Sequence, residues 1–167
     1  MLPPKGEKLN INGIKLSIEL AQIGLLPDAQ VSASQLFHDL AELKINIPLI
    51  LLDLVEDRLA GACCIAAEDL SRAAPVLEAA QASVEVIRKV GALTVFPHRA
   101  RLDLLACMLS AFARRMLPVY AVASSFATLT FTTDYVRLDE AVDCLLERAT
   151  LPDNHAPFRP EFKVRQV

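Results

Sequence analysis

The chain has 167 residues, of which 53% are hydrophobic and 22% charged, and its formal net charge is −3 at pH 7. This apolar fraction is enough to fill a core and excludes the disordered class. Acidic and basic residues are interspersed, so the sequence offers no basic field for nucleic acid or for an anionic membrane surface. We therefore expect a folded protein that binds neither nucleic acid nor membranes.

The N-terminus and the cysteines indicate a compartment. The segment MLPPKGEKLN lacks the apolar core of a secretory signal, and no uncharged apolar run approaches the roughly 18 residues that a membrane span requires. Cys63, Cys64, Cys107 and Cys144 form neither a Cys-x-x-Cys pair nor a Cys/His metal-ligand pattern. We expect a cytoplasmic protein with buried free thiols, no metal and no cofactor.

The chain begins with alternating aliphatic residues. Residues 8–23 alternate as in one or two strands, with a phase change near Asn12-Gly13 that predicts a kink or a bulge. Residues 24–30, GLLPDAQ, carry turn chemistry, and the apolar residues of 33–43 recur at helical spacing. The sequence thus predicts a strand, a loop and a helix in this order.

This helix should end where β-branched residues begin. Ile45 and Ile47 are poor helix formers, and Pro48 biases Ile47 toward extended geometry. A strand is therefore predicted to follow the helix directly and to continue to about Val55. The unit is completed by a strand at 62–67, a helix at 68–77 and a strand at 83–90.

The same order of elements repeats in the second half. The predicted elements are a strand at 91–96, a helix at 102–116, strands at 117–124 and 126–133, and a helix at 137–149. Shifting the sequence by 72 residues places Leu36 on Met108, and after a shorter hairpin a shift of 68 places Leu70 on Leu138. Apolar positions coincide throughout, which indicates an internal duplication. The last strand of the second unit is expected within 158–167, although a loose C-terminal end fits equally well.

Each half is therefore expected to be a βαββαβ module of the α+β class. In such a ferredoxin-like module two helices cover one face of a four-stranded antiparallel sheet. We expect one module at 8–90 and another at 91–150, followed by a Pro-rich connector and possible strand at 151–167. Because each module leaves a sheet face or edge uncovered, we also expect a homodimer.

Two long segments resemble a known family. The first, PDAQVSASQLFHDLAELKINIPLILLDL followed by AGACCIAAEDLSRAAPVLEAA, is similar to the first regulatory ACT domain of aspartate kinases, and residues 96–149 are similar to the second. The resemblance covers residues 8–150 and implies two ferredoxin-like ACT modules in tandem. It further implies regulation without catalysis, because ACT domains bind small ligands, most often amino acids, at interfaces between paired domains and pass the signal to an enzyme.

The resemblance also implies which residues bind a ligand. The family uses the loop between the first strand and the first helix, here Asp28, Ala29, Gln30 and Val31, and the start of the second strand, here Asn46 and Ile47. Loop amides near a helix start suit a carboxylate, and an aspartate suits an α-amino group. In the second module the loop carries Arg99 and Arg101, and Pro118 stands in place of the asparagine. The first module is therefore the better candidate.

Other function classes remain open to different degrees. The family usually has Pro-Gly in its ligand loop, whereas Gln30-Val31 stands here, so a protein-protein interaction module that has lost ligand binding, like a glycine-cleavage repressor, is the alternative. An enzyme has least support, because no Lys-Phe-Gly-Gly segment, P-loop or GxGxxG occurs. His38 is expected at a helix edge rather than in catalysis, and the threonines of 128–133 on a half-solvated strand.

Overall fold

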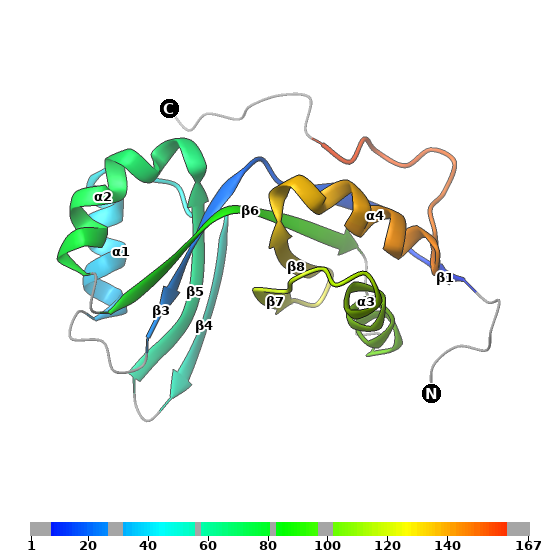
Figure 1. Ribbon diagram of the computed structural model, residues 1–167, viewed down its shortest axis with the longest axis horizontal. Coiled ribbons are helices and arrows are strands. Elements are labelled where there is room, and N and C mark those ends of the chain that lie inside the picture. Colours follow the sequence, from blue (N-terminus) through cyan, green and yellow to red (C-terminus); the bar gives the residue numbers. More distant parts are fainter. Residues whose placement is uncertain (1–7, 27–31, 56–57, 81–82, 97–101, 160–167) are drawn as a thin grey trace. The chain divides into compact units, whose positions relative to one another are not determined.

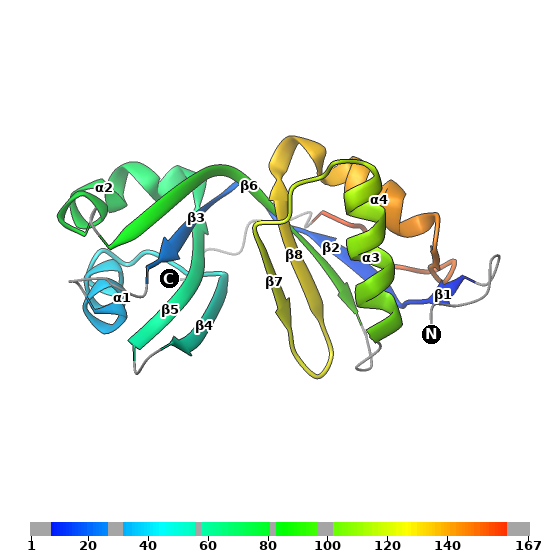
Figure 2. The ribbon, with the colours of Figure 1, turned by 60° about the horizontal axis from the view of Figure 1, so that its bottom comes forward.

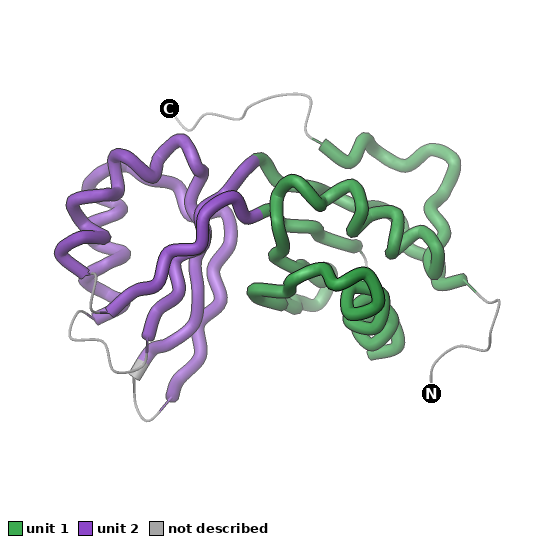
Figure 3. Tube along the Cα trace, in the orientation of Figure 1, with its two compact units in different colours: residues 1–18, 91–167 green, residues 19–90 purple. Residues whose placement is uncertain are grey.

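The computed structural model describes residues 8–26, 32–55, 58–80, 83–96 and 102–159. The chain divides into two compact units (Figure 3). Unit 2 comprises residues 19–90, and unit 1 combines residues 1–18 with residues 91–167. The strand β6, Val84–Phe96, begins in unit 2 and ends in unit 1. The chain therefore passes between the units twice.

Unit 2 is a βαββαβ module. Its strand order is β4-β5-β3-β6, and α1 and α2 lie over one face of this sheet (Figure 1). The neighbouring strands β3 and β5, and β4 and β5, pair antiparallel, as do β3 and β6. Besides the first part of β6, unit 2 contains β3 (Leu20–Leu25), α1 (Ala33–Glu42), β4 (Leu49–Val55), β5 (Arg58–Ala66), a 3-10 turn η1 (Ala67–Asp69) and α2 (Leu70–Ala79).

Unit 1 has the same arrangement but obtains its fourth strand from the N-terminus. Its strand order is β2-β6-β8-β7, and β2 pairs antiparallel with β6, with Leu16 opposite Leu93. The short β1 and β9 pair parallel beside this sheet. The elements are β1 (Leu9–Asn10), β2 (Gly13–Leu16), α3 (Leu102–Arg114), β7 (Ala121–Ser124), β8 (Leu129–Asp134), η2 (Tyr135–Arg137), α4 (Leu138–Leu146) and β9 (Ala149–Thr150).

This arrangement differs from the expected module boundaries. The first module was expected to begin at residue 8, but residues up to Ile18 belong to unit 1, because β2 occupies the place beside β6 where a fourth strand is needed. The strands expected at 83–90 and 91–96 are one continuous strand, β6. The strand expected within 158–167 is not found at 158–159, and residues 160–167 lie outside the described residues.

The predicted fold class and tandem repeat are confirmed. Each unit has its own buried cluster between helices and sheet. The residue pairs that the shifts of 72 and 68 superpose are buried in both units: Ile23 and Val95, Leu36 and Met108, Leu40 and Phe112, Ile45 and Leu117, Ala73 and Ala141, and Leu77 and Leu145. The four cysteines are buried free thiols, as expected.

The threonine-rich strand is an exception to the sequence analysis. Thr130, Thr132 and Thr133 were expected on a half-solvated face, but all three are buried. Thr130 and Thr94 share a hydrogen bond between their Oγ1 atoms, 2.9 Å long. Polar and apolar residues alternate along a strand whether its polar face is exposed to solvent or buried. The sequence pattern of β8 therefore could not distinguish the two cases. No helix in the described part of the chain is long and apolar enough to cross a membrane.

Candidate ligand site

The start of α1 is capped by a serine. The Ser32 side-chain oxygen accepts the backbone N–H of Gln35 at 3.2 Å, which satisfies one of the free donors of the first turn. A serine at this place is a strong helix start signal. The loop residues Asp28, Ala29, Gln30 and Val31 lie outside the described residues, so their role in ligand binding stays a prediction.

The end of α1 is a tight turn that presents Asn46. Lys44 has a φ of 52°, its N–H donates to Ala41 O at 2.8 Å, and the N–H of Ile45 donates to Leu40 O at 3.0 Å. This pair of hydrogen bonds with a left-handed residue is a Schellman turn, which ends a helix sharply. It buries Ile45 in the core and leaves the side chain of Asn46 exposed.

Ile47 lies between this turn and β4. It is half-buried and packs against the buried cluster of unit 2. Its position is therefore fixed by the core, while the exposed amide of Asn46 one residue earlier is open to solvent. An amide of this kind has two donors and an acceptor, so it can bind both charged groups of an amino acid.

An arginine from the second helix holds this turn in place. Arg72 donates through Nη2 to the carbonyl oxygen of Leu43, the last residue before the left-handed Lys44, and through Nη1 to Asp69 Oδ1 at 2.7 Å. A helix end leaves carbonyl groups without intrahelical partners, and a cation there also suits the helix dipole. Arg72 thus links the start of α2 to the turn that carries Asn46.

Unit 1 holds the matching turn in the same way. Met116 has a φ of 51°, and the N–H of Leu117 donates to Phe112 O at 2.9 Å. Arg137 donates to the carbonyl oxygens of Met116 at 2.8 Å and Arg115 at 3.0 Å. The residue that then corresponds to Asn46 is Pro118, which is half-buried and has no side-chain amide. Unit 1 therefore keeps the turn but not its polar side chain.

The two ends of α1 lie far apart within unit 2. Ser32, which follows the loop, lies at one end of α1, and Asn46 lies beyond the other end. A helix of ten residues is about 15 Å long at 1.5 Å per residue. An amino acid is too small to span that length.

The described residues contain no group of three or more His, Cys, Asp or Glu side chains placed to hold a metal ion. Burial raises the pKa of the Cys63 thiol to about 12 and that of Cys64 to about 11, so both are poor nucleophiles near neutral pH. The hydrogen bond from Arg137 lowers the pKa of the Glu140 carboxyl, which keeps that carboxyl ionised as a structural partner.

Sequence reasoning missed the two arginines. Arg72 and Arg137 each lie near the start of a second helix and pair with an acid three residues away, Asp69 and Glu140 respectively. That spacing is a visible signal, but it is common on solvated helix faces and so does not by itself indicate a contact to another helix. The acceptors are backbone carbonyl groups, which every residue has, so the sequence does not indicate which of them accept these hydrogen bonds.

Comparison with known proteins supports the fold. No protein-family model matches the sequence, and no curated protein matches it. Among solved structures, the chain is similar to the regulatory subunit of aspartate kinase from Thermus flavus, with a TM-score of 0.69 and 20% identity over 83% of this chain and 97% of that one. A C-terminal regulatory domain of aspartate kinase from Porphyromonas gingivalis aligns with a TM-score of 0.56 and 11% identity, over 81% and 95% of the two chains.

A longer chain, an aspartate kinase, also contains a region with this fold. The enzyme from Synechocystis aligns with a TM-score of 0.68 and 19% identity over 87% of this chain but only 28% of the enzyme. The two regulatory chains, a subunit and a domain, thus align over nearly their whole length, 97% and 95%. The chain has the fold of the regulatory region of aspartate kinases, two ferredoxin-like ACT modules in tandem.

Proposed function

We propose that this chain is a non-catalytic regulatory module that senses a small ligand, an amino acid, at an interface between modules. The single observation that carries the proposal is the turn after α1, where the core and Arg72 hold the backbone while the Asn46 amide stays exposed. A rigid backbone beside one exposed amide is what a binding site for a small polar ligand needs.

The chemistry of the two halves suits an amino acid. The start of α1 has free backbone N–H groups and the positive end of the helix dipole, which favour a carboxylate beside it. We expect Asp28 to bind the α-amino group, and Ala29, Gln30 and Val31 to form the adjacent wall of the site. E. coli aspartokinase III, which has a similar fold, has been solved in complex with lysine and aspartate, so lysine is the first candidate here.

We further propose that the chain acts as a homodimer. Ser32 and Asn46 lie at opposite ends of α1, so we expect a second copy to supply the part of the ligand site that one copy lacks. Light scattering at micromolar concentration should give twice the 18.2 kDa of one chain. A monomer under those conditions contradicts the dimer.

A thermal-shift screen of the twenty amino acids, with lysine, threonine and methionine first, tests ligand sensing. A ligand at about 100 times its dissociation constant stabilises the native state by roughly 2.7 kcal/mol, which gives a clear rise in the unfolding midpoint. The rise should disappear in Asn46→Ala and persist in Asn154→Ala, a matched change of an exposed asparagine in unit 1. If none of the twenty raises the midpoint, the chain is not an amino-acid sensor.

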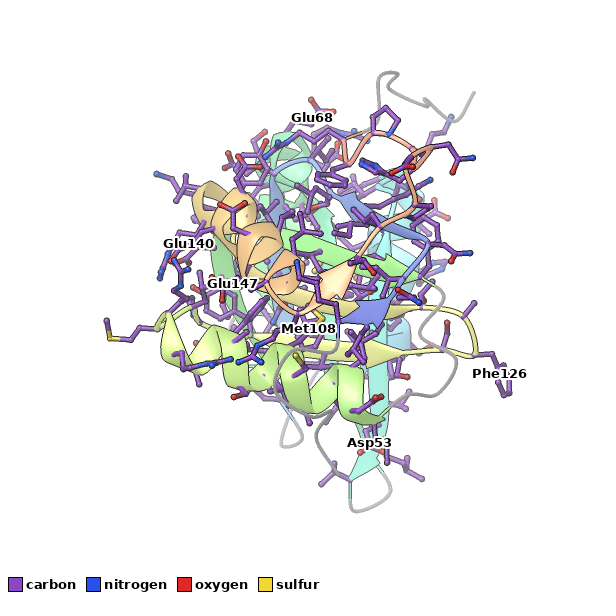
Figure 4. The ribbon with its side chains drawn as sticks, turned by 90° about the vertical axis from the view of Figure 1, so that its right-hand side faces the viewer. Asp53, Glu68, Met108, Phe126, Glu140 and Glu147 are labelled. Atoms are coloured by element: carbon purple, nitrogen blue, oxygen red, sulfur yellow. The ribbon has the colours of Figure 1, made fainter. Side chains whose placement is uncertain are left out.

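One observation favours the second candidate, a protein-protein interaction module. Phe126 is 102% exposed at the tip of the β7–β8 hairpin, where Figure 4 shows it projecting away from the chain. The turn beneath it is rigid, because Ser125 N–H donates to Thr128 O at 2.9 Å and Ser125 Oγ accepts the N–H of Thr128 at 3.0 Å. A held aromatic side chain is a common anchor at interfaces. This function is supported if no amino acid raises the midpoint and if the chain binds a protein partner that Phe126→Ala no longer binds.

A further inference from the structure

The helix α3 carries apolar side chains on its solvent-exposed side. Figure 2 shows this helix along one side of unit 1. Its core side consists of five buried residues: Leu104, Cys107, Met108, Ala111 and Phe112. On the other side Leu102 and Leu109 are 78% and 41% exposed, and Ala106 and Ala113 are exposed as well. We call these four residues the α3 stripe.

The α3 stripe has the spacing of a seam between paired helices. Its residues follow one another at intervals of four, three and four positions, which keeps them on one side of a helix. Met116, just beyond the end of α3, is 83% exposed and extends the apolar surface. The two charged residues of α3, Asp103 and Arg114, are eleven positions or about three turns apart, so they share one flank of the stripe.

The matching helix of unit 2 is polar at two of these positions. A shift of 72 residues places Ser34 on Ala106 and Lys44 on Met116, and both polar side chains are exposed. The fold of a module therefore does not require an apolar outer side on this helix. A soluble helix normally places polar residues there, and a contiguous exposed apolar surface indicates a contact with another molecule.

We propose that α3 pairs antiparallel with α3 of a second copy of this chain. In this pairing Leu109 of each copy packs against Ala106 of the other, and Leu102 packs against Ala113. The two-fold axis lies level with residues 107–108. Each large side chain then meets a small one, so the two stripes interdigitate. Antiparallel pairing also sets the dipoles of the two helices in opposite directions.

The charges of α3 identify a second copy as the occupant of this surface. Asp103 lies near the start of the helix and Arg114 at its end, on the same flank. In the antiparallel pair Asp103 is two positions, about 3 Å along the helix, from the level of Arg114 of the other copy, and the symmetry repeats this pair. A parallel pair would instead set aspartate beside aspartate and arginine beside arginine, which is destabilising. The helix is thus complementary in charge to its own antiparallel copy.

The next register of the two stripes is less favourable. A two-fold axis level with Ala111 would pack Leu109 against Ala113 and leave Leu102 without a facing residue in the other α3. Asp103 and Arg114 of the two copies would then be five positions, about 7.5 Å, apart along the helix. The apolar and charged residues together therefore favour the axis at residues 107–108.

This contact goes beyond the proposed ligand site, because it lies on α3 of unit 1 and requires no ligand. It rests on the proposed function only in that both need two copies of the chain to associate. The two proposals can therefore fail separately.

A lysine within the stripe tests the contact on the full chain. Ala106→Lys should halve the mass that light scattering measures at micromolar concentration, because a charge would be buried in the seam. Ser34→Lys is the matched control, since it adds the same charge at the equivalent exposed position of α1 and should leave the mass unchanged. Circular dichroism confirms that both variants are folded. The inference is overturned if Ala106→Lys keeps the mass of the parent chain, or if Ser34→Lys lowers the mass equally.

Reversal of the charges tests the direction and the register. Asp103→Arg and Arg114→Asp should each raise the dissociation constant of the pair about fivefold in sedimentation equilibrium, since two such ion pairs form and each contributes modestly. The double variant carries the same two charges exchanged, so its dissociation constant should return to that of the parent chain. A double variant that associates more weakly than either single variant would contradict antiparallel pairing.

The outcomes separate this contact from the proposed function. A monomeric parent chain contradicts both this contact and the proposed homodimer. A dimer that persists in Ala106→Lys overturns the α3 contact and leaves the homodimer standing. If no amino acid raises the unfolding midpoint but Ala106→Lys separates the copies, ligand sensing is refuted and the α3 contact is supported.

Discussion

Units 1 and 2 share one topology but complete it differently. In unit 2 the fourth strand is the next one along the chain, the first part of β6, whereas unit 1 uses the second part of β6 as its first strand and takes β2 from the N-terminus as its fourth. Unit 1 is therefore built from two separate segments. The comparison teaches that a repeat in sequence need not be a repeat of independent, contiguous domains.

The arginine contacts make a similar point at the level of single residues. In unit 2 the acid Asp69 precedes Arg72, whereas in unit 1 Arg137 precedes the acid Glu140. The shift of 68 places Asp69 on Arg137 and Arg72 on Glu140, so the charges are exchanged between equivalent positions. Both arginines nevertheless donate to carbonyls at the end of the preceding helix. The contact is retained although the residues that make it have changed places.

The two hairpins differ in length. By the same shifts, the pair of Leu52 and Gly61 in unit 2 corresponds to Ser124 and Leu129 in unit 1, which is the last pair of that hairpin. Unit 2 continues for three further pairs to Val55 and Arg58. The exposed leucines of β4 lie partly in this extension. This extension of the hairpin is thus found in unit 2 and not in the described strands of unit 1.

The largest expected effect comes from Gly61, the residue at which the longer hairpin departs from the shorter one. Its φ is +137°, and an added Cβ would lie 2.2 Å from the backbone oxygen of Leu51. Gly61→Ala should lower the free energy of unfolding by about 3 kcal/mol, because it combines backbone strain with a backbone clash. Urea unfolding followed by circular dichroism measures this.

Gly24 provides the control for that change. An added Cβ there would meet nothing nearer than 3.7 Å, so Gly24→Ala should alter stability by less than about 1 kcal/mol. Equal losses for the two variants would show that the close approach of β4 to Gly61 is not what holds the extended hairpin.

A second prediction exchanges equivalent core residues. Ile65 in unit 2 corresponds to Thr133 in unit 1, and both are fully buried. The Oγ1 of Thr133 has no hydrogen-bond partner among the described residues. Thr133→Val should therefore stabilise the chain by about 1 kcal/mol, because a methyl group replaces an unsatisfied hydroxyl. Ile65→Thr should destabilise it by about 2 kcal/mol.

Chemical denaturation of the two variants gives both values. The signs matter more than the sizes, since the two changes are opposite in direction at equivalent positions. A loss of stability in Thr133→Val would mean that the hydroxyl has a role that its surroundings do not reveal, and the equivalence of the two positions would then fail.

The sequence supported the prediction of most of the fold because core positions repeat. Leu36 and Met108, or Ala73 and Ala141, are apolar at matching places since each module must bury the same helix faces. The origin of the fourth strand of unit 1 was not predictable in the same way. Residues 8–23 look like a strand in either unit, and only pairing in space assigns Gly13–Leu16 to β6. Periodicity determines the element but not its neighbour.

The candidate site was predictable only in part. The residue pattern predicted that the helix ends before Asn46 and Ile47, because Pro48 and the β-branched residues are there, whereas a ligand-binding role for these two residues came only from the family resemblance and stays a prediction. The contact of Arg72 with this turn could not be predicted from the sequence, because its acceptor is a backbone carbonyl oxygen. That Ser32 and Asn46 lie at opposite ends of α1 follows from the order of the elements in the module.

The smallest effect concerns a bond that unit 1 has and unit 2 lacks. Tyr120 Oη donates to Asp134 Oδ1 at 2.6 Å, whereas Pro48 and Ala66 occupy the corresponding positions of unit 2. This hydrogen bond, with partial burial, raises the pKa of the Tyr120 phenol above its ordinary value. Between the unfolded pKa of about 10 and the raised value, the native state binds more protons, so stability falls as pH rises.

Tyr120→Phe removes the bond and its pH dependence together. The contribution is fully present below about pH 10 and is lost as the pH rises through the raised value. The unfolding free energy of Tyr120→Phe should therefore be lower than that of the parent chain at about pH 8, and the difference should shrink toward about pH 11. Tyr135→Phe, a change of the other tyrosine, is the control. A difference that stays constant over this pH range would mean that the phenol proton does not bind Asp134, and the contrast between the units at this position would then be one of packing alone.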